Sequence, residues 1–371
     1  MTKQFLRRRA LFFLPCLLFL IIIVAFYELT YDNEIQNEFH HHSSYTNTNS
    51  SRAVAIHYHE SLRYIPHSTV DAWSERDYLI VFGIPSVDVD GWRRRRYLQR
   101  TTCWQFPGVA TRRNNFTGDM LVLYVLARHP SQGYEYSAAL VKEAGEWHDI
   151  IALSMKEGVS TVPKMIGGLG YYSLEAGVGL SRKVYFWFEL ALGIFSKVNY
   201  FAKGDDDTFI YIPQFLADLK VLPNRCLYWG AMVLSRHSVH FDFAVGPCYT
   251  LSRDVAESFL SYKPLSRLLS LSYDSARESE YAALHVSTED VMVGRVLHDV
   301  KSQCLVLVNE SIYRFHDLHY SKYKARPTNC SVFLHHLKEK EYVKLMKKYS
   351  NRIAETGKKY KLISGRIVFD C

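Results

Sequence analysis

The sequence lacks the common motifs for zinc, nucleoside phosphates and dinucleotides. Seven cysteines occur in 371 residues, and no two have the C-x-x-C spacing of zinc or dithiol redox sites. No G-x-x-x-x-G-K-S/T loop and no G-x-G-x-x-G fingerprint occurs either. These absences argue against a zinc-ribbon protein, a P-loop enzyme and a dinucleotide-dependent oxidoreductase.

The chain also lacks a strong surplus of one charge. Its formal net charge is +8, and half of that surplus comes from Lys3, Arg7, Arg8 and Arg9. Residues 28–371 hold 41 basic and 37 acidic residues, with no basic stripe interleaved with aromatics, which argues against a dedicated nucleic-acid binder. Hydrophobic residues are 48% and charged residues 22%, a globular composition that excludes a largely disordered or fibrous chain.

One long apolar run lies near the N-terminus. Residues 10–27 carry no charge and would span about 27 Å as a helix, close to the hydrocarbon thickness of a bilayer. Basic residues precede the run and acidic residues follow it, so the positive-inside rule places residues 1–9 in the cytosol. We expect a single-pass anchor with the body of the protein across the membrane; the alternative is a cleaved signal peptide.

The remainder of the chain is consistent with an oxidising compartment. Residues 28–75 are polar and predict a flexible stem, which leaves 76–371 as the folded domain. Outside the apolar run, six cysteines allow up to three disulfides: Cys103, Cys226, Cys248, Cys304, Cys330 and Cys371. Four sequons for N-glycosylation begin at Asn49, Asn115, Asn309 and Asn329.

Short apolar runs alternate with helical patterns in the folded domain. The runs at 78–84, 119–127, 149–155 and 198–203 predict strands, and 180–195 predicts a helix. Continuously apolar strands separated by helices are typical of a parallel sheet that is covered on both faces. We therefore expect an α/β, Rossmann-like fold with a mostly parallel sheet flanked by helices.

Three adjacent carboxylates, Asp205, Asp206 and Asp207, directly follow the last of these strands. They should lie at the carboxyl edge of the sheet, where open α/β sheets bind ligands. Mg²⁺ or Mn²⁺ bridging a diphosphate needs only one or two protein carboxylates. The triplet therefore predicts a nucleotide–metal site, and the alternative is a solvated acidic turn before Pro213.

Four blocks of the chain, in this order, resemble the β-1,3-glycosyltransferase family of galactosyl- and N-acetylglucosaminyltransferases, above all its protozoan branch of UDP-Gal/UDP-GlcNAc-dependent enzymes. The blocks are WRRRRYLQRTTCW at 92–104, KGDDDTFIYIPQFLADL at 203–219, FAVGPCYTLSRDVA at 243–256 and EDVMVG at 289–294. The likeness covers about residues 76–320. It implies a GT-A fold and an inverting enzyme of the Golgi membrane that uses a UDP-sugar.

The resemblance also assigns roles to single residues. Asp207 matches the metal ligand, Asp205 and Asp206 match the carboxylates that face ribose and position the metal, and Asp290 matches the catalytic base. A histidine further along commonly completes the metal site, for which His316 comes first and His319 second. The expected ion is Mn²⁺ or another divalent cation, and the donor is UDP-Gal or UDP-GlcNAc.

Two questions stay open at this stage. Arg96 or Arg100 could assist as the cationic partner of the donor phosphate, since guanidinium groups bind phosphate oxygens strongly. A non-catalytic lumenal carbohydrate-binding protein on the same fold is the alternative to an enzyme, but such a protein would need neither Asp207 nor Asp290.

Overall fold

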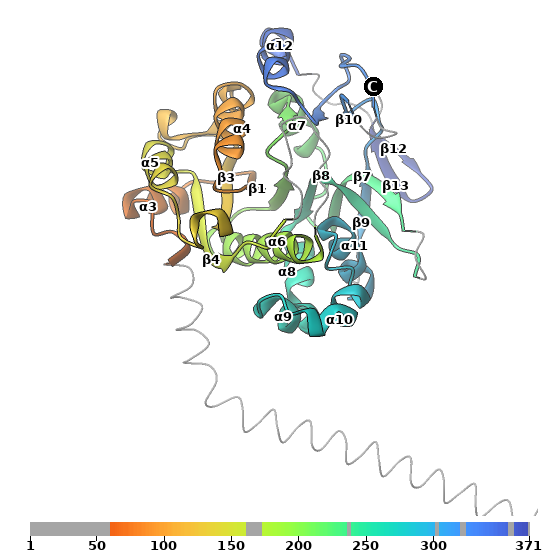
Figure 1. The fold of residues 1–371 in the computed structure, drawn as a ribbon. Coiled ribbons are helices and arrows are strands. Elements are labelled where there is room, and N and C mark those ends of the chain that lie inside the picture. Colours follow the sequence, from red (N-terminus) through yellow and green to blue (C-terminus); the bar gives the residue numbers. More distant parts are fainter. Residues whose placement is uncertain are drawn as a thin grey trace, which may run out of the picture. The chain divides into compact units, whose positions relative to one another are not determined.

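The computed structural model describes residues 60–160, 173–235, 239–300, 304–319, 324–354 and 360–369. Residues from Glu60 onward form one compact unit (Figure 1). The expected cytosolic tail, anchor and first part of the stem lie outside the described residues. Within the described ranges, no helix has the length and apolar character needed to cross a membrane.

The centre of the unit is a parallel array that confirms the four predicted strands. β5 (Tyr200–Gly204) pairs with β1 (Ile80–Pro85), β1 pairs with β3 (Met120–Arg128), and β3 pairs with both β4 (Ile150–Lys156) and β2 (Val109–Ala110). Every residue of β1 is buried, as a strand covered on both faces requires.

The other half of the ten-stranded sheet makes it mixed. β8 (Asp242–Ser252) runs antiparallel to both β5 and β7 (Leu227–Leu234). Beyond β7 follow β9 (Val306–Asn309), β13 (Arg366–Phe369) and β12 (Tyr360–Ile363). Six of the nine strand pairings are parallel, so the expected α/β fold with a mostly parallel sheet is confirmed.

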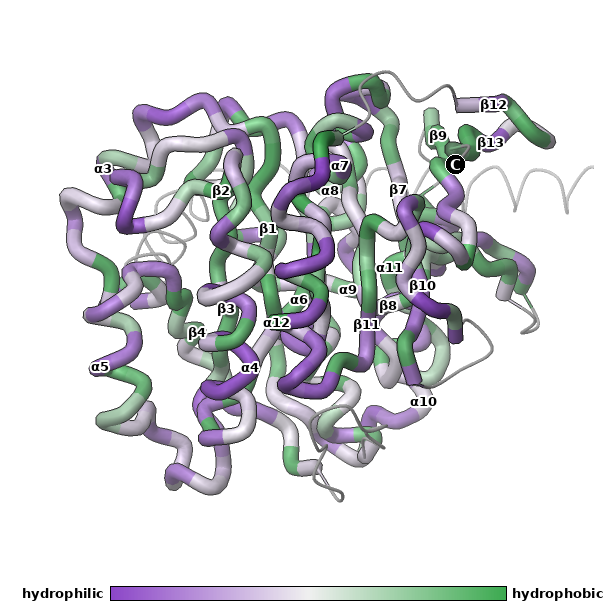
Figure 2. Tube along the Cα trace, turned by 90° about the horizontal axis from the view of Figure 1, so that it is seen from above, coloured by the Kyte–Doolittle hydropathy of each residue, from purple (hydrophilic) through white to green (hydrophobic). Residues whose placement is uncertain are grey.

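Helices cover both faces of the sheet (Figure 1). One face carries α6 (Leu174–Ile194), α8 (Arg253–Ser261), α9 (Lys263–Ser270), α10 (Glu278–Ala283) and α11 (Glu289–Asp299). The other carries α4 (Asp90–Arg100), α5 (Ala138–Trp147), α7 (Ile212–Leu219) and α12 (Glu339–Tyr349). Hydrophobic colour runs along the central strands, and the flanking helices alternate between hydrophobic and hydrophilic (Figure 2).

The predicted helix at 180–195 begins earlier, at Leu174, because the Ser173 side chain caps it by accepting from the Ala176 amide. It packs closely on β1. A Cβ built on Gly83 would lie 2.0 Å from the Trp187 ring, so only glycine fits there.

The compact unit also starts before the expected domain boundary. Residues 60–75, expected in the stem, include α3 (His67–Glu75). Trp73 of this helix is completely buried, with its ring against Phe116 and Phe195. Apolar burial of this kind orders the segment as part of the domain.

A second, three-stranded sheet brings distant segments to the end of β5. β10 (Phe315–Asp317) runs parallel to β11 (Phe333–His335), and β11 runs antiparallel to β6 (Phe209–Ile210). Since β6 begins two residues after Asp207, this pairing places residues beyond 330 beside the aspartate triplet.

Fewer than three disulfides form among the six cysteines outside the apolar run. Cys226 and Cys304 are joined, and Cys330 is also disulfide-bonded. Cys103 and Cys248 are buried free thiols. Burial raises the pKa of the Cys103 thiol to about 12, so it is an inert core residue rather than a reactive one.

Removing the Cys226–Cys304 bridge should destabilise the domain. The two residues are 78 positions apart, and closing a loop of that size restricts the unfolded chain by about 4–5 kcal/mol in the chain-entropy model. We expect the double variant Cys226→Ser/Cys304→Ser to lose free energy of unfolding on that scale in urea titration. Cys103→Ser, which breaks no bridge, is the control, and an equal loss in both variants would contradict the assignment.

Candidate metal centre and active site

The aspartate triplet lies at the carboxyl end of β5, as the sequence predicts. Asp205 follows directly on Gly204, and its amide donates to the Pro247 carbonyl of the neighbouring strand β8 at 3.0 Å. Asp206 and Asp207 are buried, whereas the Asp205 side chain is 25% exposed. The alternative of a solvated acidic turn is therefore wrong for two of the three carboxylates.

Asp206 is held by the residue that follows β1 and by an arginine of α4. Its Oδ2 accepts from the Ser86 hydroxyl at 2.7 Å, and its Oδ1 accepts from Arg95 Nη1 at 3.0 Å. The same guanidinium lies 3.8 Å from Asp207 Oδ2. Arg95 therefore offsets the negative charge of two adjacent carboxylates that would otherwise repel each other.

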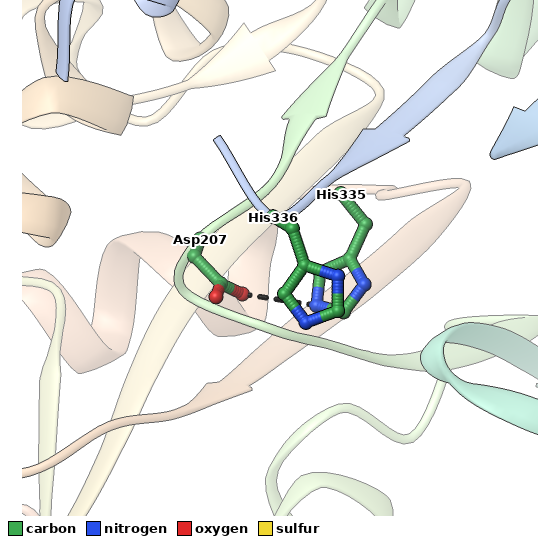
Figure 3. Close-up of side chains that lie close together, drawn as sticks. All are labelled: Asp207, His335 and His336. Carbon is green, nitrogen blue, oxygen red and sulfur yellow. Dashed lines mark ion pairs between the residues drawn. The ribbon is translucent and has the colours of Figure 1, made fainter. Parts of the chain in front are cut away.

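Asp207 faces two adjacent histidines from the end of β11, His335 and His336 (Figure 3). His335 Nε2 lies 3.1 Å from Asp207 Oδ1 and 3.4 Å from Asp205 Oδ2. Asp207, His335 and His336 each offer one ligand atom within 4.8 Å of the others, and all three side chains are buried.

A fourth residue, Asp317 at the end of β10, lies behind both imidazoles. Its Oδ1 is 2.7 Å from His335 Nδ1 and 3.1 Å from His336 Nδ1. A proton on Nδ1 of His335 leaves Nε2 directed at Asp207, which is the carboxylate–histidine arrangement found behind metal ligands. Burial lowers the pKa of His335, but Asp207, Asp205 and Asp317 outweigh it and raise that pKa well above the usual imidazole value.

The donor set fits a divalent cation. One carboxylate oxygen and two imidazoles suit first-row ions such as Mn²⁺ and Zn²⁺. The ligand atoms of Asp207 and His335 lie 3.1 Å apart, and those of all three residues lie within 4.8 Å of one another. Asp207, His335 and His336 could therefore hold the ion, while Asp205 lies beside them with one partly exposed carboxylate.

The histidines expected from the resemblance are placed elsewhere. His316 Nε2 is hydrogen-bonded to the Ser331 hydroxyl at 2.8 Å, and His319 Nε2 lies 2.7 Å from Glu341 Oε1. Neither belongs to the cluster around Asp207 in the described part of the chain.

Arg96 and Arg100 face a second group of carboxylates, away from Asp207. Arg96 pairs with Glu143 at 2.7 Å, and Arg100 pairs with Glu143 at 2.5 Å and with Asp149 at 2.7 Å. Both guanidinium groups are buried. Arg96 also donates to the Ser86 hydroxyl at 2.8 Å, so it supports Asp206 through Ser86. Successive helical residues point about 100° apart, which is why the neighbouring Arg95 reaches the aspartates instead.

Asp290 lies in the first turn of α11, beside a bulge of β8. Its Oδ2 accepts from the Gly246 amide at 2.8 Å, and its Oδ1 accepts from the Val291 amide at 2.9 Å. Burial raises its pKa above the usual aspartate value, although Lys203 opposes the shift. A half-buried carboxylate whose pKa is raised is more basic than a solvated aspartate, which suits a general base.

Lys203 links the aspartate triplet to Asp290 through Gly246. Its buried ammonium lies 2.8 Å from Asp205 Oδ1, 2.6 Å from the Gly246 carbonyl and 2.5 Å from Glu289 Oε1. Glu289 is further held by the Tyr249 hydroxyl at 2.9 Å. Burial raises the pKa of Glu289 to about 7, against the lowering effect of Lys203.

Sequence reasoning missed His335, His336, Asp317 and the linking role of Lys203. One local signal was present: the adjacent histidines directly follow the apolar segment VFL at 332–334. Polar residues at the end of a short strand indicate a candidate ligand site, as the aspartates at the end of β5 do, because strand ends meet at sheet edges.

Comparisons with known proteins add little to this geometry. No model of a protein family matches the sequence, and no curated protein is detectably similar to it. One similar solved structure is that of a glycosyltransferase involved in the glycosylation of the major capsid of PBCV-1. The similarity covers 72% of this chain and 98% of that chain, with 10% identity and a TM-score of 0.33. Similarity at this level identifies neither a shared fold nor an activity, so the side chains of the site must carry any functional conclusion.

Proposed function

We propose that this protein is a metal-dependent glycosyltransferase with a GT-A fold, which moves Gal or GlcNAc from a UDP-sugar to a glycan hydroxyl with inversion. One observation carries the proposal. A carboxylate–imidazole cluster suited to a divalent cation and a separate half-buried carboxylate suited to a base lie at one sheet edge, joined through Lys203 and Asp205.

The residues divide into two sets with complementary tasks. Asp207, His335 and His336 would hold the divalent ion, which when bound neutralises charge on a diphosphate leaving group. Asp205, the most exposed of the three aspartates, is suited to accept hydrogen bonds from ribose hydroxyls. Asp290 would take the proton from the acceptor hydroxyl as that oxygen attacks the anomeric carbon. Attack on the face opposite the diphosphate inverts the configuration of that carbon.

The membrane topology follows from the same proposal. An enzyme that modifies glycans in the Golgi lumen needs its domain on that side, and residues 10–27 with their basic flank provide an anchor of the required orientation. We propose a single-pass Golgi protein whose residues after 27, the stem and the domain, are lumenal. Endoglycosidase treatment of the cell-expressed protein tests this, because a shift to lower mass requires sequons in the lumen.

The direct test is turnover by the full-length protein in mild detergent. We expect release of UDP from UDP-Gal or UDP-GlcNAc that requires Mn²⁺ and increases with a glycan acceptor, and we expect Mn²⁺ with UDP to raise the melting temperature. A carbohydrate-binding protein without activity would bind glycans but show no Mn²⁺-dependent stabilisation by UDP. A folded sample that shows neither stabilisation nor release with any UDP-sugar refutes the proposal.

Substitutions decide whether His335 or His316 is the metal ligand. His335→Ala should weaken Mn²⁺ binding at least about tenfold, because it removes a ligand directed at Asp207. His316→Ala should leave Mn²⁺ affinity within about twofold, since that imidazole is held by Ser331. Mn²⁺ titration followed by electron paramagnetic resonance measures both, and the reverse order of effects would restore His316 as the ligand.

A further inference from the structure

The turn that carries the three aspartates, residues 205–208, joins β5 to β6. Backbone carbonyls that are buried in such a turn need hydrogen-bond donors from elsewhere in the chain. The carbonyl of Asp206 accepts from the Tyr342 hydroxyl at 3.4 Å. The carbonyl of Asp207 accepts from the Leu337 amide at 3.2 Å. The two middle carbonyls of the turn are therefore held by residues that follow β11.

One side chain of α4, Gln99, is hydrogen-bonded to both ends of the turn. Its Nε2 donates to the Asp205 carbonyl at 3.2 Å and to the Thr208 carbonyl at 3.1 Å. The Thr208 hydroxyl lies 3.1 Å from the same nitrogen and donates to the Asp205 carbonyl at 2.8 Å. An amide nitrogen carries two hydrogens, so one glutamine can bridge two carbonyls. Gln99 and Thr208 are completely buried, so water cannot replace these bonds.

The position of Gln99 on α4 explains why it reaches the turn. It lies four residues after Arg95, and residues with this spacing share one face of a helix. Arg95 contacts the side chains of Asp206 and Asp207, and Gln99 contacts the backbone of the same turn. One face of α4 therefore offsets the charge of the turn and also bonds its two ends.

A second set of hydrogen bonds fixes the orientation of the Gln99 amide. The Trp104 indole donates to Tyr124 Oη at 2.8 Å. An indole N–H can only donate, which leaves the Tyr124 hydrogen for Gln99 Oε1 at 3.0 Å, the nearer of its two acceptors. Carbonyl oxygens can only accept, so the amide nitrogen of Gln99 must face the turn. All three side chains are buried.

We propose that Gln99 is a positioning residue of the candidate metal centre, because it holds the aspartate turn in the form that binds the cation. This inference rests on the metal site of the proposed function. Asp207 Oδ1 and Asp205 Oδ2 lie 3.1 and 3.4 Å from His335 Nε2, so both ends of the turn bear on the site. Neighbouring carboxylates repel each other, and a turn free to open would move them apart before an ion binds. Gln99 acts through the backbone and touches neither ion nor sugar.

Mn²⁺ titration of the full-length protein in mild detergent, followed by electron paramagnetic resonance, tests the proposal on Gln99→Met. Methionine has a similar length but no hydrogen-bond donor. We expect the Kd for Mn²⁺ to rise at least about tenfold, as is typical when a partner behind the metal ligands is removed. The spectrum of the bound ion should also change, because the ligands are no longer held in one geometry.

Hydrogen exchange of the metal-free protein gives a measurement that needs neither ion nor substrate. Backbone amides exchange when a segment opens locally, and the loss of bonds to the turn makes that opening easier. Exchange in a peptide that covers residues 200–210 should therefore be faster in Gln99→Met than in the wild type. Unchanged exchange in this peptide contradicts a role of Gln99 in holding the turn.

Gln214→Met is the matched control. Gln214 is also buried, and its Nε2 donates to Asp218 Oδ1 at 2.8 Å, outside the turn. This variant should keep the Kd for Mn²⁺ within about twofold, whatever stability it loses. Gln99→Glu keeps the shape of the side chain but turns an acceptor toward the carbonyls, and it serves if the methionine variant does not fold.

The outcomes separate this inference from the proposed function. A Kd for Mn²⁺ that is unchanged in folded Gln99→Met overturns the inference while the proposed function stands. Equal rises in Gln99→Met and Gln214→Met overturn it as well, since they report only a loss of stability. If the folded wild type binds no Mn²⁺, the metal centre, the proposed function and this inference are refuted together.

Discussion

Replacing Asp290 by asparagine should lower the turnover number about 10³-fold while Mn²⁺-dependent UDP binding stays within about threefold. In the proposed reaction the carboxylate receives the proton, and an amide cannot do so. Its two oxygens are placed by the Gly246 and Val291 amides, so the base is oriented before any substrate arrives. Turnover and UDP affinity are measured on the same preparation, because only their separation identifies a group that acts in the chemical step.

The asparagine also destabilises the fold. An amide has one acceptor oxygen where the carboxylate has two, so one of the two backbone donors loses its partner, at a cost of about 1–3 kcal/mol. Asp299→Asn, at the other end of α11 and paired with Arg295, is the control for a changed carboxylate on the same helix. If Asp290→Asn keeps more than a tenth of wild-type turnover, another group is the base.

Replacing Lys203 by methionine should have the second large effect, on stability and turnover together. The ammonium is buried between Asp205 and Glu289, and methionine removes the cation from both carboxylates, leaving His335 beside Asp205. Breaking a buried pair in this way costs about 3–5 kcal/mol. The loss also releases the Gly246 carbonyl, and Gly246 positions Asp290. We expect turnover per folded molecule to fall at least about tenfold.

A second buried cation distinguishes a loss of stability from a loss of turnover. Arg314 is completely buried and pairs with Asp218 and Glu310, away from the aspartate triplet. Arg314→Met should lose comparable stability in urea titration but retain turnover per folded molecule. If both variants lose only the fraction of activity that their unfolded fraction explains, Lys203 has no part in positioning the base.

The pH dependence of Lys203→Met gives an independent measurement. Burial raises the pKa of both Glu289 and Asp290, and Lys203 lowers both. Without the lysine the opposing influence is gone, so both pKa values rise further and the base is protonated at a higher pH. The acid limb of the kcat/KM profile should therefore move to higher pH in the variant. An unchanged or lower midpoint contradicts the proposed link.

Much of the central fold could be predicted because its signals are local. The apolar runs that become β1, β3, β4 and β5 are buried on both faces, which requires continuous hydrophobicity in sequence. The antiparallel insertion of β8 was not predictable in this way. A run of apolar residues has the same composition whether its partner strand runs parallel or antiparallel.

The arginines of α4 show what the rotation of a helix adds to a sequence pattern. The block at 92–104 does contribute a cation to the triplet, but that cation is Arg95 rather than Arg96 or Arg100. Arg96 and Arg100 are four residues apart and so share one helix face, which is directed at Glu143. The phase of the helix against the sheet, set by packing, decided which guanidinium reached the aspartates.

The sequence by itself determined the place of the carboxylates: a buried strand that ends at residue 204 must present the next residues at the sheet edge. Only the tertiary structure decided their partners. His335 and His336 are about 130 positions further along and reach Asp207 because β11 pairs with β6 and β10. Such pairing depends on hydrogen bonds and packing between segments far apart in the chain, which no pattern of neighbouring residues encodes.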